Sequence, residues 1–214
     1  MSTLLSRVAA VVTIVFTLVI SLTSWLAMGL PSSASFITQN PCPLPCIYGI
    51  IPGEIDYEQT RVIVEQTAGS EYSDSPVNGG SLIFRIEQDA FSVLGMATLN
   101  LPDDTLVRAV GVLPVEEDDL GRLGDLVDSG LQPTRVYRSC DTASPLLLVA
   151  FGADSRVIAE LALPPHLRPD TPITFMRVYM DEGDTLTESV VSFGCAVETG
   201  WLGFAPRWTY LAAS

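Results

Sequence analysis

The sequence contains no lysine and a single histidine, and each shortage excludes a kind of chemistry. Without lysine, the chain can form neither a Schiff-base nucleophile nor the phosphate-binding lysine of a P-loop. The histidine, His166, lies among prolines with no nucleophile motif around it, so we interpret it as a solvated loop residue rather than a general base. The glycines at 79–80 and 120–124 lack the spacing of a phosphate-binding loop.

Basic residues of any kind are scarce. The chain has 11 of them, all arginine, against 25 acidic residues, which gives a formal net charge of −14. An acidic surface of this kind repels nucleic acid and anionic lipid headgroups, so we expect neither as a partner of the folded domain.

Charge is missing altogether between Val8 and Leu30. As a helix this run would cover ~34 Å, enough for the ~30 Å core of a bilayer. We therefore predict a signal-anchor or transmembrane helix within residues 1–34. Arg7 is the only basic residue before it, which predicts a single-pass protein with a cytoplasmic N-terminus and an extracytoplasmic C-terminal domain. The alternative is cleavage after Ala34 and secretion.

The four cysteines are even in number, which in an exported domain indicates two disulfide bonds. Of the three possible pairings we favour Cys42–Cys46 with Cys140–Cys195, because the Cys42-Pro43-Leu44-Pro45-Cys46 loop is short enough for its ends to meet. A thiol redox site and a zinc site remain alternatives. The C-x-x-x-C spacing differs from the redox C-x-x-C motif, and zinc would require a second close pair.

The rest of the chain shows a helix followed by strands, twice. Residues 35–46 form a linker, and Asp56 with Gln59 predicts the capped start of a helix that ends at Gly69. Tyr57, Val62, Ile63 and Val64 supply its apolar side, and a polar loop follows to Gly80. Alternating apolar residues then predict strands, which we place at 81–88, with Leu82, Phe84 and Ile86 on one face, and at 91–101 and 105–113.

The acidic run from Glu116 to Asp119 predicts the start of a second helix that ends at Gly130. The predicted fold class is α+β: the transmembrane helix is followed by helices packed on antiparallel sheet, in a possible tandem repeat of 47–113 and 114–214. The strands expected after the second helix lie at 134–139, 146–151, 156–163, 173–180, 188–196 and 201–211.

Two stretches carry a family resemblance. The stretch Gly49-Ile50-Ile51-Pro52-Gly53-Glu54-Ile55-Asp56-Tyr57-Glu58-Gln59 resembles the helix entry of the SmpA/OmlA (BamE-type) envelope lipoproteins, a fold that occurs twice in beta-lactamase-inhibitor proteins. Residues 123–136 resemble the helix end and strand entry of the same families. The Cys-Pro-Leu-Pro-Cys head is similar to that of uncharacterised bacterial exported proteins. The resemblance implies a protein-binding scaffold of the envelope without enzyme activity.

Acidic and aromatic clusters are the remaining candidates for a site. The acids at 103–104, 116–119 and 181–184 are interpreted as turn and helix-start residues, although paired carboxylates can also hydrolyse glycosides and the last group can bind calcium weakly. The aromatic residues near the C-terminus form either a core-closing strand or an exposed contact patch. They are Trp201, Phe204, Trp208 and Tyr210.

We therefore expect a non-enzymatic, membrane-anchored extracytoplasmic module that binds an envelope protein or stabilises a surface assembly. No catalytic, cofactor-binding or metal-binding residue is predicted, and no cofactor is expected. The alternative hypotheses are a small-ligand or calcium sensor and, further from the observations, an exported hydrolase that uses carboxylates.

Overall fold

The structure is a computed structural model, and it divides the chain into two compact units, Met1–Ser33 and Ala34–Ser214. In the first unit it describes only Thr13 and Phe16, both helical. In the second it describes residues 34–67, 70–75, 80–99, 106–139, 146–162, 165–181, 196–206 and 209–210.

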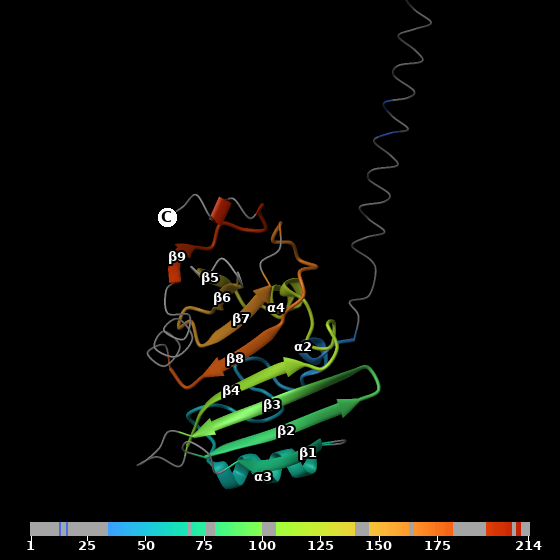
Figure 1. Ribbon diagram of the computed structural model, residues 1–214, viewed down its shortest axis with the longest axis vertical. Coiled ribbons are helices and arrows are strands. Elements are labelled where there is room, and N and C mark those ends of the chain that lie inside the picture. Colours follow the sequence, from blue (N-terminus) through green and yellow to red (C-terminus); the bar gives the residue numbers. More distant parts are fainter. Residues whose placement is uncertain are drawn as a thin grey trace, which may run out of the picture. The chain divides into compact units, whose positions relative to one another are not determined.

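One antiparallel sheet dominates this unit (Figure 1). Its nine described strands lie in the order β1-β2-β3-β4-β8-β7-β6-β5-β9, so β1 and β9 are its two edges. Two meanders, β1 to β4 and β5 to β8, meet where β4 pairs with β8. The bounds are β1 Ser70–Ser75, β2 Ser81–Gln88, β3 Phe91–Leu99, β4 Val107–Pro114, β5 Pro133–Ser139, β6 Leu146–Phe151, β7 Val157–Ala162, β8 Phe175–Tyr179 and β9 Ala196–Gly200.

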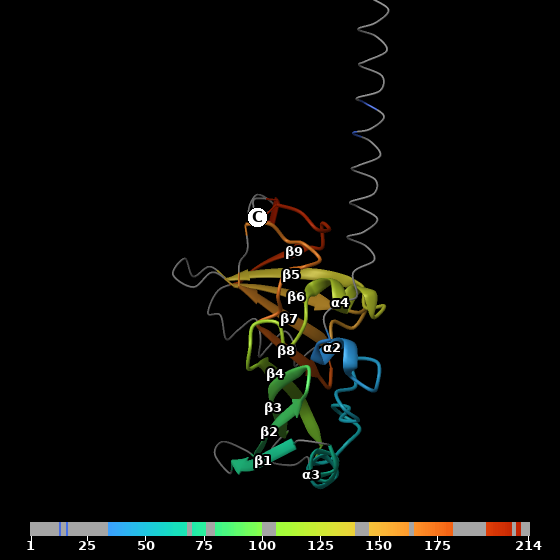
Figure 2. The same cartoon turned by 90° about the vertical axis from the view of Figure 1, so that its right-hand side faces the viewer.

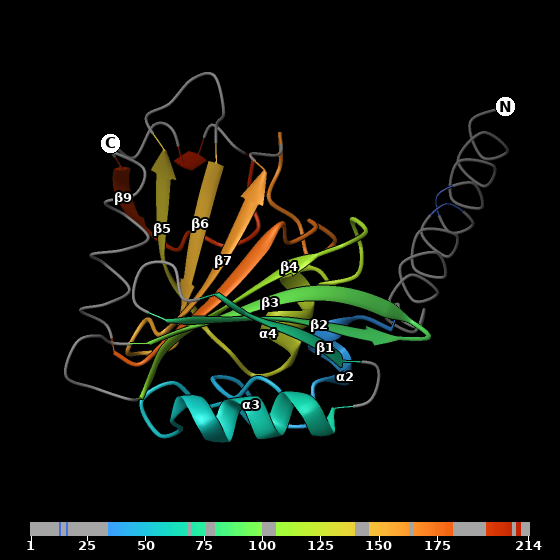
Figure 3. The same cartoon turned by 60° about the horizontal axis from the view of Figure 1, so that its bottom comes forward.

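Three short helices accompany the sheet: α2 (Phe36–Gln39), α3 (Tyr57–Gln66) and α4 (Leu123–Asp128). Figure 2 shows all three on the same side of the sheet. α3 lies against β1 and β2, as can be followed in Figure 3. The small helix α2 docks through its backbone, since Phe36 N donates to Asp119 O at 2.8 Å.

The main core lies between these helices and one face of the sheet. Alternate residues of β2, β3, β6, β7 and β8 point into it, as the period of two in a strand requires. Leu82, Phe84 and Ile86 of β2 are all buried there, which confirms the face predicted from the sequence. From the helical side, Phe36 and Val64 complete the same cluster.

A second, smaller cluster is buried on the opposite face of the sheet. Its aromatic members are Tyr137 and Tyr179, and Leu148, Ala150, Ile158 and Ala109 complete it. Beside it, the Arg177 guanidinium lies 4.8 Å from the Phe175 ring centroid and donates to the Tyr179 hydroxyl at 3.2 Å. Burial raises the pKa of the neighbouring Glu160 carboxyl, and the charge of Arg177 lowers it by less.

The predicted fold class is wrong. The architecture is one large antiparallel sheet with a few short helices, instead of a transmembrane helix followed by helices packed on sheet. Two local misreadings contributed. The segment predicted as a polar loop contains β1, and the acidic run 116–119 forms turns, so α4 begins only at Leu123 and has 6 residues.

The predicted single-pass membrane topology is also corrected. Among the residues that the structure describes, no helix has the length and apolar character needed to cross a membrane. The longest, α3, has 10 residues and is therefore ~15 Å long, half of the ~30 Å core of a bilayer. The run predicted to span, residues 8–30, lies outside the described residues except for Thr13 and Phe16.

Candidate functional site

A groove lies beside α3, and the segment before that helix forms one of its walls. This segment begins with the disulfide Cys42–Cys46, which confirms the predicted pair. The amide of Asn40 organises the loop, since its Nδ2 donates to the carbonyls of Cys42 and Cys46 at 2.7 Å each. Its Oδ1 accepts from Tyr48 N at 2.9 Å, which links the loop to the turn that follows.

That turn is a tight hairpin between Ile47 and Ile50, whose backbone groups exchange hydrogen bonds of 2.9 and 2.8 Å. Its central residues have positive φ, 49° at Tyr48 and 90° at Gly49, as a type I′ turn requires. The Tyr48 ring stacks on Phe36 with centroids 5.5 Å apart, which fixes the side chain of the turn against α2. Ile47 and Ile50 are buried, so the hairpin anchors the wall of the groove in the core.

A second turn places the lining residues Ile51 and Glu54. Glu54 N donates to Ile51 O at 3.1 Å, and Gly53 has φ 86°, which fits a type II turn with proline at its second position. The turn is held from two sides. Gly53 N donates to Val107 O at 2.8 Å, and the Arg156 guanidinium donates to Pro52 O at 3.2 Å. Arg156 thus connects the β6–β7 hairpin to the groove.

The opposite wall is α3 itself. Asp56 caps its N-terminus, since Asp56 Oδ1 accepts from Gln59 N at 2.8 Å while Gln59 Oε1 accepts from Asp56 N at 3.2 Å. This reciprocal capping box confirms the helix start expected from the sequence. Thr60 and Val64 point into the core, which leaves the side with Gln59, Val62 and Ile63 to line the groove.

The groove has a volume of about 620 Å³, within the range of about 300–1,000 Å³ that is usual for small-molecule sites. Its surface is mainly apolar, from Ile51, Ile55, Val62 and Ile63. Val62, one of the lining residues, is 44% exposed. The groove therefore offers apolar area that an occupant would remove from water.

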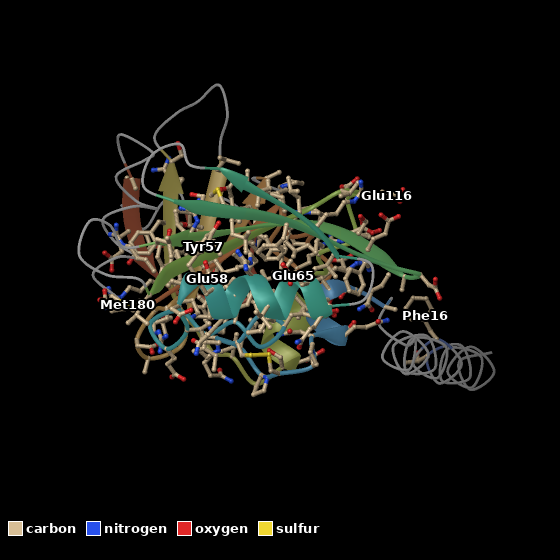
Figure 4. The ribbon with its side chains drawn as sticks, turned by 90° about the horizontal axis from the view of Figure 1, so that it is seen from below. Phe16, Tyr57, Glu58, Glu65, Glu116 and Met180 are labelled. Atoms are coloured by element: carbon tan, nitrogen blue, oxygen red, sulfur yellow. A yellow bond between two sulfur atoms is a disulfide. The ribbon has the colours of Figure 1, made fainter. Side chains whose placement is uncertain are left out.

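Carboxylates border this apolar surface. The described lining residues include Glu54 and Glu58, both exposed, and no basic side chain. The nearest arginine of the helix, Arg61, pairs with Glu58 at 3.2 Å and with Glu65 at 3.6 Å. Figure 4 shows Glu58 and Glu65 toward opposite ends of α3. An occupant that is apolar with a positive charge at its edge would match the groove.

Comparisons with protein-family models, with curated proteins and with solved structures find no match. The resemblance to envelope scaffold proteins therefore stays a prediction, and the groove has to be interpreted from its own residues.

None of the other sequence-predicted site residues that the structure describes lines the groove. Cys140 and Cys195 are outside the described residues, although their chain neighbours Ser139 and Ala196 are directly paired between β5 and β9. His166 is exposed and forms a backbone bridge with Pro206. Residues 103–104 and 182–184 are outside the described part, and within that part no group of three or more metal-ligating side chains occurs.

The C-terminal aromatic residues form a small cluster rather than the predicted strand 201–211. The strand β9 ends at Gly200, and residues 201–206 continue as a loop. Within it the Trp201 ring lies 5.6 Å from Phe204 and 6.1 Å from Tyr210. Trp208 lies outside the described residues.

The sequence interpretation missed the groove because it assigned Val62, Ile63 and Val64 to one apolar side of the helix. Three consecutive residues span about 200° of a helix at 3.6 residues per turn, so they cannot all face the core. The structure buries Val64 to 2% exposure and leaves Val62 outside. The uninterrupted apolar run was the signal that part of this helix would present an apolar surface.

Proposed function

We propose that this chain is a non-enzymatic protein-binding module, and that the groove beside α3 holds a segment of a protein partner. The observation that supports the proposal most directly is the apolar groove around Val62 with Glu54 and Glu58 at its border. Apolar surface supplies affinity, and border charges select a partner of complementary sign and speed its approach. The occupant is a segment with one or two large apolar side chains next to an arginine or lysine.

The structure of the two walls favours this role. The helix is capped, and the facing segment is held by the disulfide loop, two turns and Arg156, so both walls are ordered before a partner arrives. A preformed groove avoids the entropy loss of ordering loops on binding. Arg156 is a positioning residue here, since it touches the backbone of the wall and does not line the groove.

The test is a display screen of random peptides against the full chain, followed by anisotropy measurements on the enriched sequences. The proposal expects enrichment of apolar side chains beside a basic residue. Val62→Asp should weaken binding at least tenfold, because it places a charge on the apolar surface. Glu54→Gln should reduce the preference for the basic residue.

A matched control is Leu94→Asp. Leu94 is 42% exposed, close to the 44% of Val62, but it lies on β3, away from the groove. Peptide affinity should not change in this variant. No enriched peptide, or equal losses from Val62→Asp and Leu94→Asp, would contradict the proposed function.

A further inference from the structure

A loop at the far edge of the sheet has the features expected of an occupant of the groove. Residues Trp201 to Pro206 contain no charged side chain. Two exposed large apolar side chains lie here, Leu202 at 51% and Phe204 at 42%. They lie on either side of Gly203, which has φ 86° and open space around it.

The loop is fixed at both ends. Trp201 N donates to Thr134 O at 3.1 Å, which attaches the start of the loop to β5. Leu167 N donates to Ala205 O at 2.9 Å, which attaches its end to the segment around His166. The exposed side chains are therefore presented from a backbone held in place at two points.

The centre of the loop is fixed by the buried Tyr210. Its hydroxyl donates to Gly203 O at 2.6 Å and accepts from Leu202 N at 3.2 Å. Burial raises the pKa of this hydroxyl, and the bond from the Leu202 backbone lowers it by less, so the phenol stays protonated and able to donate. A loop held in this way loses little conformational entropy when its side chains are buried by a partner.

The charges next to the loop complement those of the groove. His166 and Arg168 are exposed on the segment bonded to the loop, with Asp170 two residues further on. The carboxylate of Glu198, on β9, is paired with Arg135 at 3.7 Å. An apolar projection with an arginine beside it matches an apolar groove with Glu54 and Glu58 at its border.

We propose that the loop 201–206 of one copy of this chain occupies the α3 groove of a second copy. This inference rests on the proposed function of the groove and names its partner. Within one copy the two surfaces cannot meet, because α3 lies at the β1 edge and the loop follows β9. Eight strand spacings of ~4.8 Å separate those edges, or ~38 Å along the sheet. Figure 1 shows α3 and the C-terminal segment at opposite ends of the sheet.

The contact is heterologous, since a loop surface meets a groove surface and each copy retains one of each. Such contacts build rings or open chains instead of closed two-fold dimers. Each copy carries a net charge of −14, so the copies repel one another at long range. Salt screens this repulsion over ~8 Å at 0.15 M, so it does not prevent contact between two copies at that concentration.

Sedimentation velocity of the full chain over a range of concentrations tests the proposal, with Leu202→Ser as the loop variant and Val62→Asp as the groove variant. The wild type should form concentration-dependent oligomers. Each variant alone should associate at least tenfold more weakly. Both changes are at exposed positions, so both variants should keep the wild-type circular dichroism spectrum.

Mixing the two variants is the decisive measurement. The loop variant has an intact groove and the groove variant an intact loop, so an equimolar mixture should form a one-to-one dimer and nothing larger. A mixture that stays monomeric, or a wild type that is monomeric throughout, overturns the proposed self-association. If display peptides still bind the wild-type groove in that case, the proposed function stands and only the identity of the partner is wrong.

Discussion

Gly95 is a position where adding a single methyl group should destabilise the sheet. It lies on β3 directly opposite Phe84 of β2, and Phe84 is 1% exposed. A Cβ on Gly95 would overlap the Cε2 and Cζ atoms of the Phe84 ring. Glycine ordinarily weakens a strand interior, but here its missing side chain leaves the space that the ring fills. We predict that Gly95→Ala is destabilising.

The size of the effect follows from two opposing contributions. Overpacking a buried site costs about 1–3 kcal/mol, because the ring must leave its preferred position. Replacing glycine with alanine also restricts the unfolded chain, which stabilises by about 0.4–1 kcal/mol. The net expectation is a loss of about 1–2 kcal/mol in the free energy of unfolding, or roughly 2–8 °C in melting temperature for a domain of this size.

Two other glycines provide matched controls for the same substitution. Nothing lies within 4 Å of a Cβ built on Gly200, so Gly200→Ala should leave stability unchanged or raise it slightly. At Gly111 the nearest atom is Phe175 Cζ at 2.9 Å, the far end of a half-buried side chain that can turn away, so the loss should be intermediate.

Urea unfolding and thermal melts of the three variants measure these differences in stability. Phe84→Leu combined with Gly95→Ala should recover part of the loss, because leucine leaves room for the added methyl group. A Gly95→Ala protein as stable as wild type, or a Gly200→Ala protein that loses just as much, would refute the packing argument.

Three further predictions concern the cap, a buried carboxyl and the cysteines. Asp56→Ala should cost about 1 kcal/mol in urea unfolding, because Gln59 N loses its acceptor, while Asp56→Asn should cost less. Burial raises the pKa of Glu160 in the folded state. At pH values between its unfolded and folded pKa, the folded state keeps a proton that the unfolded chain has released, so stability falls as pH rises through this range. Glu160→Gln should therefore raise the melting temperature at pH 7, with the difference disappearing below about pH 4 in a pH series of melts. Alkylation and mass spectrometry should label no cysteine before reduction and all four after it; labelling of Cys140 and Cys195 without reductant would show that the second predicted disulfide is wrong.

Several elements were predictable from the sequence because the interactions that specify them lie within a few residues. The alternation of Leu82, Phe84 and Ile86 matches β2 because side chains in a strand alternate between its faces. The bounds predicted for β6, 146–151, are those observed. The cap at Asp56 and the disulfide Cys42–Cys46 each involve residues four or fewer positions apart.

Other elements could not be predicted because their partners lie far along the chain. The segment Ser70–Ser75 is polar apart from Tyr72, and pairing with β2 makes it a strand. The junction of β4 with β8 joins residues about 70 positions apart, so no local pattern indicates that the two meanders form one sheet. The acidic run 116–119 has the composition of a helix start, but the backbone there follows turns while α2 bonds to Asp119 and Leu120.

The candidate site likewise has parts that could be predicted from the sequence and parts that could not. Local sequence determined its parts: a capped helix with three apolar residues in a row, a proline-glycine turn and a short disulfide loop. Only the tertiary structure decided that Val64 faces the core, that Val62 stays outside, and that Arg156, 104 positions from Pro52, holds the opposite wall in place. Turns and caps are stabilised by neighbouring residues, whereas a groove exists only where distant segments meet and leave apolar surface uncovered.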